Sequence, residues 1–107
     1  MAARDFLIDD EEQRLARADK EIYRRLSLVV GNAIRRCTDS AWPQWKDYGG
    51  RGIKVLGDWA EDPYLFVEYL ATLPGHIDSS LILDRIDNNA DYEPGNLRFV
   101  TRSVSNF

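Results

Sequence analysis

Apolar residues recur at every third or fourth position through the first third of the chain. This spacing places them along one side of an α-helix, because the helix completes a turn in about 3.6 residues. Asp9 and Asp10 can cap the start of such a helix, and the two glutamates that follow put negative charge in its first turn, where the helix dipole favours it. The pattern predicts a flexible N-terminus over residues 1–9 and a helical segment over residues 10–37, which Gly31 can bend or split.

Aromatic residues and glycines replace this periodicity in the middle of the chain, residues 38–80. The first part of this region has the composition of a loop pinned by tryptophan and tyrosine side chains, and residues 53–56 then favour a short extended segment. A second helix is predicted over residues 63–73. Asp62 can cap it, Pro63 suits its first position, and a Pro-Gly pair ends it.

Two short apolar runs, residues 81–83 and 97–100, lie close to the end of the chain. The connection between them is rich in Asp and Asn, which is typical of a hairpin with a long polar loop. Thr101 can cap a final helix that reaches Asn106. Residues 81–107 are therefore expected to form a ββα unit, and the whole chain a single α+β domain whose N-terminal helices pack on that unit.

Length and composition agree with one domain. The chain has 107 residues, of which 44% are hydrophobic, enough for one buried core and too few for two. The single cysteine, Cys37, excludes an internal disulfide and a thiolate-rich zinc site, and this favours a reducing compartment. No apolar run approaches the roughly 18 residues of a membrane span, and the first residues lack the plan of a signal peptide. We expect a cytoplasmic protein with no membrane partner.

Charge is distributed unevenly along the chain. The net charge of −4 argues against a general affinity for DNA, because neutralisation of phosphates is the source of non-specific binding. However, residues 20–54 carry net positive charge and residues 55–97 net negative charge. This segregation fits a protein that binds a polyanion with one segment and a metal with another, and it fits equally an acidic protein that docks on a basic partner.

Carboxylates and amides gather around the two apolar runs. Asp84 and Asp87 lie near the end of the first run, Asn96 begins the second, and Asn106 lies in the expected final helix. Their oxygens are hard donors that suit Mg²⁺ or Mn²⁺, and such an ion can bind a scissile phosphate and stabilise the charge that develops on it. Asp and Asn are also the common residues of hairpin turns, so turn chemistry alone is the alternative explanation.

Basic residues in the first half of the chain alternate with tryptophan and tyrosine, as in a track for nucleic-acid phosphates. The alternative is a solvated helix face beside a tryptophan-pinned core. In the Gly-Gly-Arg-Gly cluster, closely spaced glycines allow the backbone to approach a ligand, and Arg51 can present its fork to a phosphate. A tight turn in which Arg51 pairs with Asp47 or Asp58 is the other possibility. The candidate nucleic-acid contacts are Arg35, Arg36, Arg51, Lys54 and Arg98.

Several strings along the chain occur together, in the same order and with similar spacing, in one protein family. They are Tyr-Gly-Gly-Arg-Gly-Ile at 48–53, Leu-Asp-Arg-Ile-Asp-Asn at 83–88, Tyr-Glu-Pro at 92–94 and Asn-Leu-Arg-Phe-Val-Thr at 96–101. Through them the chain resembles the small HNH-like endonucleases found in phage genomes, over most of its length. The resemblance implies a ββα-metal fold, a DNA substrate, hydrolysis of phosphodiester bonds with Mg²⁺ or Mn²⁺, and a location in the cytoplasm of a bacterial host.

The same resemblance assigns roles to individual residues. In the wider HNH group the first strand carries Asp-His; its metal-binding Asp matches Asp84, while its general-base His position holds Arg85. An arginine cannot take a proton from water, although it can hold a phosphate through two donors. The central motif Asn matches Asn96, whose role in the family is mainly to brace the loop. The last motif residue falls at Ser105 or Asn106, and Asn106 is the expected second metal ligand.

The general base is left without a clear candidate. His76 is the only histidine and lies in the loop before the first strand, where the alternative is a merely solvated side chain. Tyr92 is a further candidate base or phosphate contact, although packing against the hairpin explains it as well. The leading hypothesis is a metal-dependent DNA endonuclease. Its rival, favoured by Arg85 and the acidic composition, is a catalytically inactive HNH-fold protein that binds DNA or a host protein as a phage regulator or inhibitor.

Overall fold

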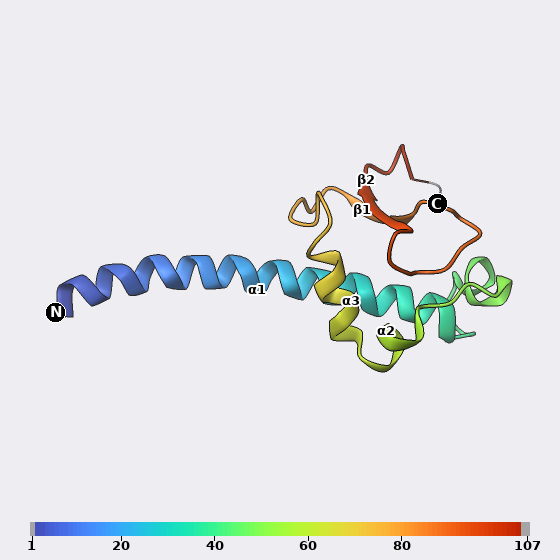
Figure 1. Cartoon of the computed structure of the whole chain (residues 1–107), viewed down its shortest axis with the longest axis horizontal. Helices are drawn as coiled ribbons and strands as arrows, with labels where there is room; N and C mark the ends of the chain where they lie inside the picture. Colours follow the sequence, from blue (N-terminus) through green and yellow to red (C-terminus); the bar gives the residue numbers. More distant parts are fainter. Residues whose placement is uncertain (1, 106–107) are drawn as a thin grey trace.

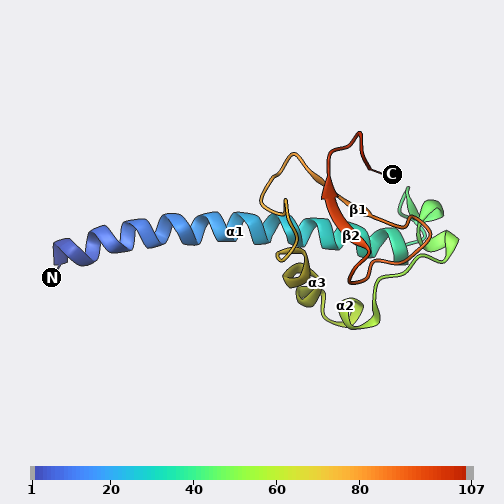
Figure 2. The same cartoon turned by 45° about the horizontal axis from the view of Figure 1, so that its top comes forward.

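The long helix α1 (Ala2–Thr38) lies between two smaller structures (Figure 1). The short helices α2 (Gly57–Glu61) and α3 (Pro63–Leu70) lie on one side of its C-terminal half. A hairpin of β1 (Ile82–Arg85) and β2 (Leu97–Val100) lies on the other side (Figure 2). This computed structural model describes the backbone of residues 2–105 and the side chains of residues 19–105.

Helix α1 begins earlier than the sequence pattern indicates. It starts at Ala2 rather than at residue 10 and continues through Gly31, so residues 2–9 are helical, whereas the pattern predicts the helix only from residue 10. The reason is that residues 2–9 contain neither Gly nor Pro, so nothing in them stops a helix, and the two aspartates lie within it instead of capping it. The N-terminal half of α1 extends away from the rest of the chain (Figures 1 and 2).

The apolar core lies where α1 meets α3. Phe66 on α3 is fully buried, and its ring stacks on that of Trp59 from α2 at 4.4 Å between centroids. As predicted, Asp62 caps α3: its Oδ1 accepts a hydrogen bond from the backbone N–H of Tyr64 at 3.2 Å. The helix stops at Leu70, three residues before the expected end, because the chain then turns through short-range hydrogen bonds. The buried apolar side chains are Leu26, Val30, Ala33, Tyr48, Ile53, Trp59, Phe66, Val67, Leu70, Tyr92 and Leu97.

The aromatic loop between α1 and α2 consists of tight turns, including short 3-10 helices at Trp45–Asp47 and Gly49–Arg51. It packs directly on the end of α1, since a Cβ added at Gly49 would lie 2.3 Å from the carbonyl oxygen of Cys37. The extended segment expected at residues 53–56 is reduced to one parallel bridge between Val55 and Tyr92.

The predicted hairpin is confirmed. Strands β1 and β2 pair antiparallel, with Asp84 opposite Arg98 and Arg85 opposite Leu97. After β2 the carbonyl of Thr101 accepts hydrogen bonds from the N–H groups of residues 104 and 105, which makes a single turn. Up to residue 105 the structure therefore contains an α+β fold without the expected final helix, and Asn106 lies outside the described residues. Within the same part of the chain, no helix combines the length and apolar character needed to cross a bilayer.

Candidate functional site

Asp84 is the carboxylate on which the hairpin and the C-terminal segment converge. It lies on β1 and is only 4% exposed. Its Oδ2 accepts a hydrogen bond from Nε of Arg98, its cross-strand neighbour, at 2.9 Å. Its Oδ1 accepts one from the hydroxyl of Ser105 at 2.8 Å. Two donors thus compensate the burial of this carboxylate, and the one from Ser105 ties the segment after β2 to the first strand.

The ion pair of Asp84 reaches the protein surface through its partner. The side chain of Arg98 is 37% exposed, against 3% for that of Asp84. An arginine carries five N–H donors, and the contact with Asp84 uses Nε. Arg98 therefore joins the buried carboxylate to a surface on which a phosphate can meet positive charge.

Arg85, the next residue on β1, is directed into the protein's own loop. It is 6% exposed, and its Nη1 donates to the carbonyls of Asn88 and Ala90 at 2.6 and 2.8 Å. Its guanidinium carbon also lies 5.0 Å from the ring centroid of Tyr48 and 5.5 Å from that of Tyr92. Arg85 thus organises the connection between the strands. The phosphate contact predicted for Arg85 did not indicate this role.

Asn96 closes the same connection from its other end. Its Oδ1 accepts from the N–H of Asp87 at 2.7 Å, and its Nδ2 donates to the carbonyls of Asp87 and Asp91 at 3.2 and 2.8 Å. The Asp87 carboxylate, exposed to solvent, accepts from the N–H of Asn89 at 2.9 Å, which is turn chemistry. The side-chain amide of Asn96 therefore has the geometry of a brace across the loop.

The connection between the strands also docks on the Gly-rich cluster. Nη2 of Arg51 donates to Oδ1 of Asn89 at 2.9 Å, and Nη1 donates to the main-chain carbonyl of Asp47 at 3.1 Å. The backbone of Lys54 donates to Oδ1 of Asp91 at 2.9 Å and accepts from the N–H of residue 92. Arg51 therefore contacts the main-chain carbonyl of Asp47 and not its carboxylate. Its guanidinium joins the aromatic loop to the connection between the strands.

Two stacked tyrosines pack against the guanidinium of Arg85. The rings of Tyr48 and Tyr92 lie 6.2 Å apart, and both residues are buried. Burial raises the pKa of Tyr48 to about 12, and the neighbouring hydroxyl of Tyr92 adds to the rise. Burial also raises the pKa of Tyr92, although Arg36 opposes it. Burial thus favours the neutral phenol at both positions, which argues against Tyr92 as the general base.

His76 is held in the loop between α3 and β1. Its Nδ1 lies 2.8 Å from the carbonyl oxygen of Leu73, and because that oxygen can only accept, Nδ1 carries the proton. The carbonyl of His76 accepts from Nη2 of Arg25 on α1. Within the described residues these contacts join His76 to α1 and to the turn after α3, not to Asp84.

The predicted basic track is anchored in the aromatic loop. The guanidinium of Arg35 lies 5.2 Å from the ring centroid of Trp42, and that of Arg36 lies 5.3 Å from the ring centroid of Tyr48. Nε of Arg36 also donates to Oε1 of Gln44 at 2.7 Å. The two arginines thus fix the last turn of α1 to the loop that follows. Gln44 takes part in this contact, and no sequence signal indicated it.

The donors around Asp84 fit a hard divalent ion. The carboxylate of Asp84 and the hydroxyl of Ser105 are oxygen donors, as Mg²⁺ and Mn²⁺ prefer. Between residues 19 and 105 there is no group of three or more His, Cys, Asp or Glu side chains that could hold a metal by itself. Mg²⁺ commonly binds through one or two carboxylates and completes its shell with water and substrate phosphates, so one carboxylate suffices for such an ion.

Comparison with known proteins found no similar protein. No family model matches this chain, and neither does any curated protein or solved structure with which it was compared. The likeness to HNH-like endonucleases therefore stays a prediction from the sequence strings.

Proposed function

We propose that this protein is a metal-dependent HNH-like endonuclease that hydrolyses DNA phosphodiester bonds, with Asp84 as its metal-binding carboxylate. The observation that carries the proposal is the 2.8 Å hydrogen bond from Ser105 to Asp84. It joins Asp84 to Ser105, one of the two positions that match the last motif residue of the family. The order and spacing of the family strings supply the choice of chemistry.

Each neighbour of Asp84 has a role in this proposal. Bound Mg²⁺ or Mn²⁺ would polarise the scissile phosphate and stabilise the charge on the leaving oxygen. Arg98 orients the Asp84 carboxylate and, at the surface, meets a phosphate of the DNA backbone. Asn96 and Arg85 keep the connection between the strands in one conformation, so that the carboxylate is positioned before the substrate arrives.

A plasmid-nicking assay tests the proposal. Supercoiled DNA is incubated with the protein in Mg²⁺, in Mn²⁺ and in chelator, and the Asp84→Asn variant is compared with Asp87→Asn. The two variants make the same chemical change, but Asp87 is exposed and its carboxylate caps a turn. We expect metal-dependent nicking that falls more than about 100-fold in Asp84→Asn, because even outer-shell partners of a metal contribute 10–100-fold. Asp87→Asn should retain it.

Two outcomes would contradict the proposal that the protein is an endonuclease. One is the absence of nicks with either ion, and the other is equal nicking by Asp84→Asn and the wild type. Far-ultraviolet circular dichroism of both variants shows whether a loss of activity reflects loss of fold.

A second candidate function is DNA binding without cleavage. It is favoured by Arg85, which stands where the HNH group has its general base and donates to Asn88 and Ala90. A guanidinium cannot take a proton from water, so this position supplies no general base. In this case the protein retards DNA in a gel in the presence of chelator, affinity falls steeply with salt, and no condition gives nicks.

A further inference from the structure

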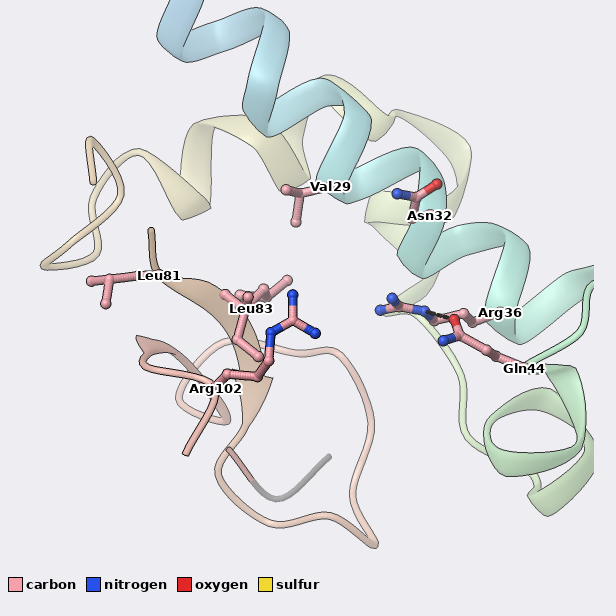
Figure 3. A pocket seen from close by; sticks show the side chains of 8 residues that line it. Val29, Asn32, Arg36, Gln44, Leu81, Leu83 and Arg102 are labelled. Atoms are coloured by element: carbon pink, nitrogen blue, oxygen red, sulfur yellow. Dashed lines mark hydrogen bonds between the residues drawn. The ribbon is translucent and has the colours of Figure 1, made fainter. Parts of the chain in front are cut away.

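A cavity of about 240 Å³ lies between α1 and the hairpin (Figure 3). Helix α1 contributes one wall through Asn32 and Arg36. The opposite wall is formed by β1 and by Arg102, which follows β2. Asp84 is not among the residues that line it, so the cavity is distinct from the site proposed above.

Two arginines face each other across this cavity. Figure 3 shows the side chains of Arg36 and Arg102 extending into it from opposite walls. Gln44 holds the guanidinium of Arg36 in place through the 2.7 Å hydrogen bond to Nε. None of the described residues that line the cavity is a carboxylate. Guanidiniums on opposite walls of a partly enclosed space can both contact an anion that enters it.

The lining indicates which anion fits. Two guanidiniums match a ligand of two negative charges better than a carboxylate, and their planar forks match the oxygens of a phosphate. A phosphate monoester carries about −1.5 to −2 charges near pH 7. The aliphatic side chains of Val29, Leu81 and Leu83 offer a surface for the organic part of the ligand. At about 240 Å³ the cavity is a little smaller than the roughly 300 Å³ lower limit of pockets for drug-sized ligands, which restricts it to small groups.

We propose that this cavity binds a phosphate monoester, carried either by a free nucleotide or by the 5′ end of a DNA strand. The inference uses Arg36, Arg102 and Asn32 and requires neither a metal ion nor cleavage. Its failure would leave the Asp84 site untouched, and loss of nicking would leave this cavity untouched.

Isothermal titration calorimetry in chelator tests the binding and its source. The probes are inorganic phosphate, a nucleoside 5′-monophosphate, and one oligonucleotide with either a 5′-phosphate or a 5′-hydroxyl. We expect the nucleoside monophosphate to bind more tightly than inorganic phosphate, because its organic part meets the aliphatic wall. An affinity gain of about tenfold or more from the 5′-phosphate identifies a DNA end as the source. Binding of the monophosphate without that gain identifies a free nucleotide.

Three variants separate this site from general positive charge. Arg102→Gln removes one guanidinium from an exposed position and should weaken nucleoside monophosphate binding by about tenfold or more. Arg24→Gln is the matched control, since Arg24 is an exposed arginine of α1 whose partner is Glu21. Asn32→Glu places a carboxylate in the lining beside the arginines, and it should abolish binding because it repels the phosphate.

Several results would overturn the proposal. The first is that neither inorganic phosphate nor the nucleoside monophosphate binds the wild type at millimolar concentration. The second is equal affinity in Arg102→Gln and Arg24→Gln. The third is an Asn32→Glu variant that binds the nucleoside monophosphate as tightly as the wild type does.

Discussion

The contact between α1 and α3 and the connection between β1 and β2 are stabilised by different means. Where the helices meet, the buried side chains are apolar, with Leu26 and Phe66 both at 0% exposure. In the connection, the buried side chains include Arg85 and Asn96, and each bonds several oxygen or nitrogen atoms of its own loop. The first region depends on the volume and area of its side chains, and the second on a few specific hydrogen bonds.

This difference bears on function. Hydrogen bonds from Arg85, Asn96 and Arg51 restrain this loop in the absence of any ligand. Asp84 lies at the border of the two regions, on a strand in which Leu83 packs against the core and whose polar end leads into the connection. The helical core supplies stability, and the connection supplies the geometry of the candidate site.

The largest effect is expected from a cavity in the helical core. Phe66→Ala removes a fully buried ring that stacks on Trp59, and it should lower the free energy of unfolding by about 3–5 kcal/mol. Leu65→Ala, one residue away and 41% exposed, should cost less than about 1 kcal/mol. Urea denaturation followed by tryptophan fluorescence measures both. Similar losses in the two variants would contradict a core centred on Phe66.

A single amide in the connection should cost somewhat less. Asn96→Ala removes three hydrogen bonds to Asp87 and Asp91 and should lower the free energy of unfolding by about 2–3 kcal/mol. Asn89→Ala, in the same loop, removes one exposed contact with Arg51 and should cost about 0.5 kcal/mol. Hydrogen exchange should localise the loss in Asn96→Ala to residues 86–96. Exchange that increases equally in α1 and α3 would show that the two regions are not separable.

Alkaline pH should weaken the junction between the two regions. Burial raises the pKa of the Cys37 thiol from 9.0 to about 11, and that of Tyr48 from 10.0 to about 12. The folded protein therefore holds these protons more tightly than the unfolded chain does. Stability is unaffected by these groups below about pH 9, falls between pH 9 and 11 through Cys37, and falls from pH 10 to 12 through Tyr48.

The Cys37→Ala variant separates the two contributions. Urea denaturation at pH 7, 9 and 10 should show a smaller decline above pH 9 in the variant than in the wild type, because only the tyrosine contribution is left. An identical decline in both proteins would show that Cys37 does not contribute to the loss of stability above pH 9.

The reactivity of Cys37 gives a second measurement. At pH 8, iodoacetamide should modify the native thiol about 100-fold more slowly than the unfolded one, because the thiolate population differs by that factor.

The smallest expected effect is a gain in the helical region. Gly31 lies within α1, and a Cβ added there has no atom within 4 Å. Gly31→Ala should therefore raise the free energy of unfolding by about 0.5–1 kcal/mol through the better helix propensity of alanine. Thermal unfolding measures the gain, and the hydrogen exchange of residues 86–96 serves as the control because it should not change. A loss of stability would show that α1 is bent or closely packed at this position.

Local patterns predicted the parts of the fold that depend on near neighbours. The apolar stripe of α1, the Asp62 cap of α3 and the pairing of the two apolar runs into a hairpin are all confirmed. Helix α2 was not predicted, because its five residues are too few for a periodic pattern. The early start of α1 was missed because two aspartates that can cap a helix can also lie within one.

The candidate site could be located from the sequence but not assembled from it. Asp84, Asn96 and the Arg85 position follow from the motif strings, and Ser105 was one of two positions considered for the last motif residue. The inward direction of Arg85 and the attachment of His76 to the helices carry no sequence signal. The pairing of Arg36 with Gln44, and the position of Arg102 opposite it, also depend on how distant segments pack.

The sequence by itself determined most of α1 and of α3, which two runs pair, and where carboxylate, amide and guanidinium groups occur. Periodicity, capping and turn chemistry act between residues a few positions apart, so they can be recognised without the fold. Only the tertiary structure decided what those groups contact. Arg51 meets Asn89 across 38 positions of sequence, and Arg25 meets His76 across 51. Such contacts depend on the packing of the helices against the hairpin, which is a property of the whole chain.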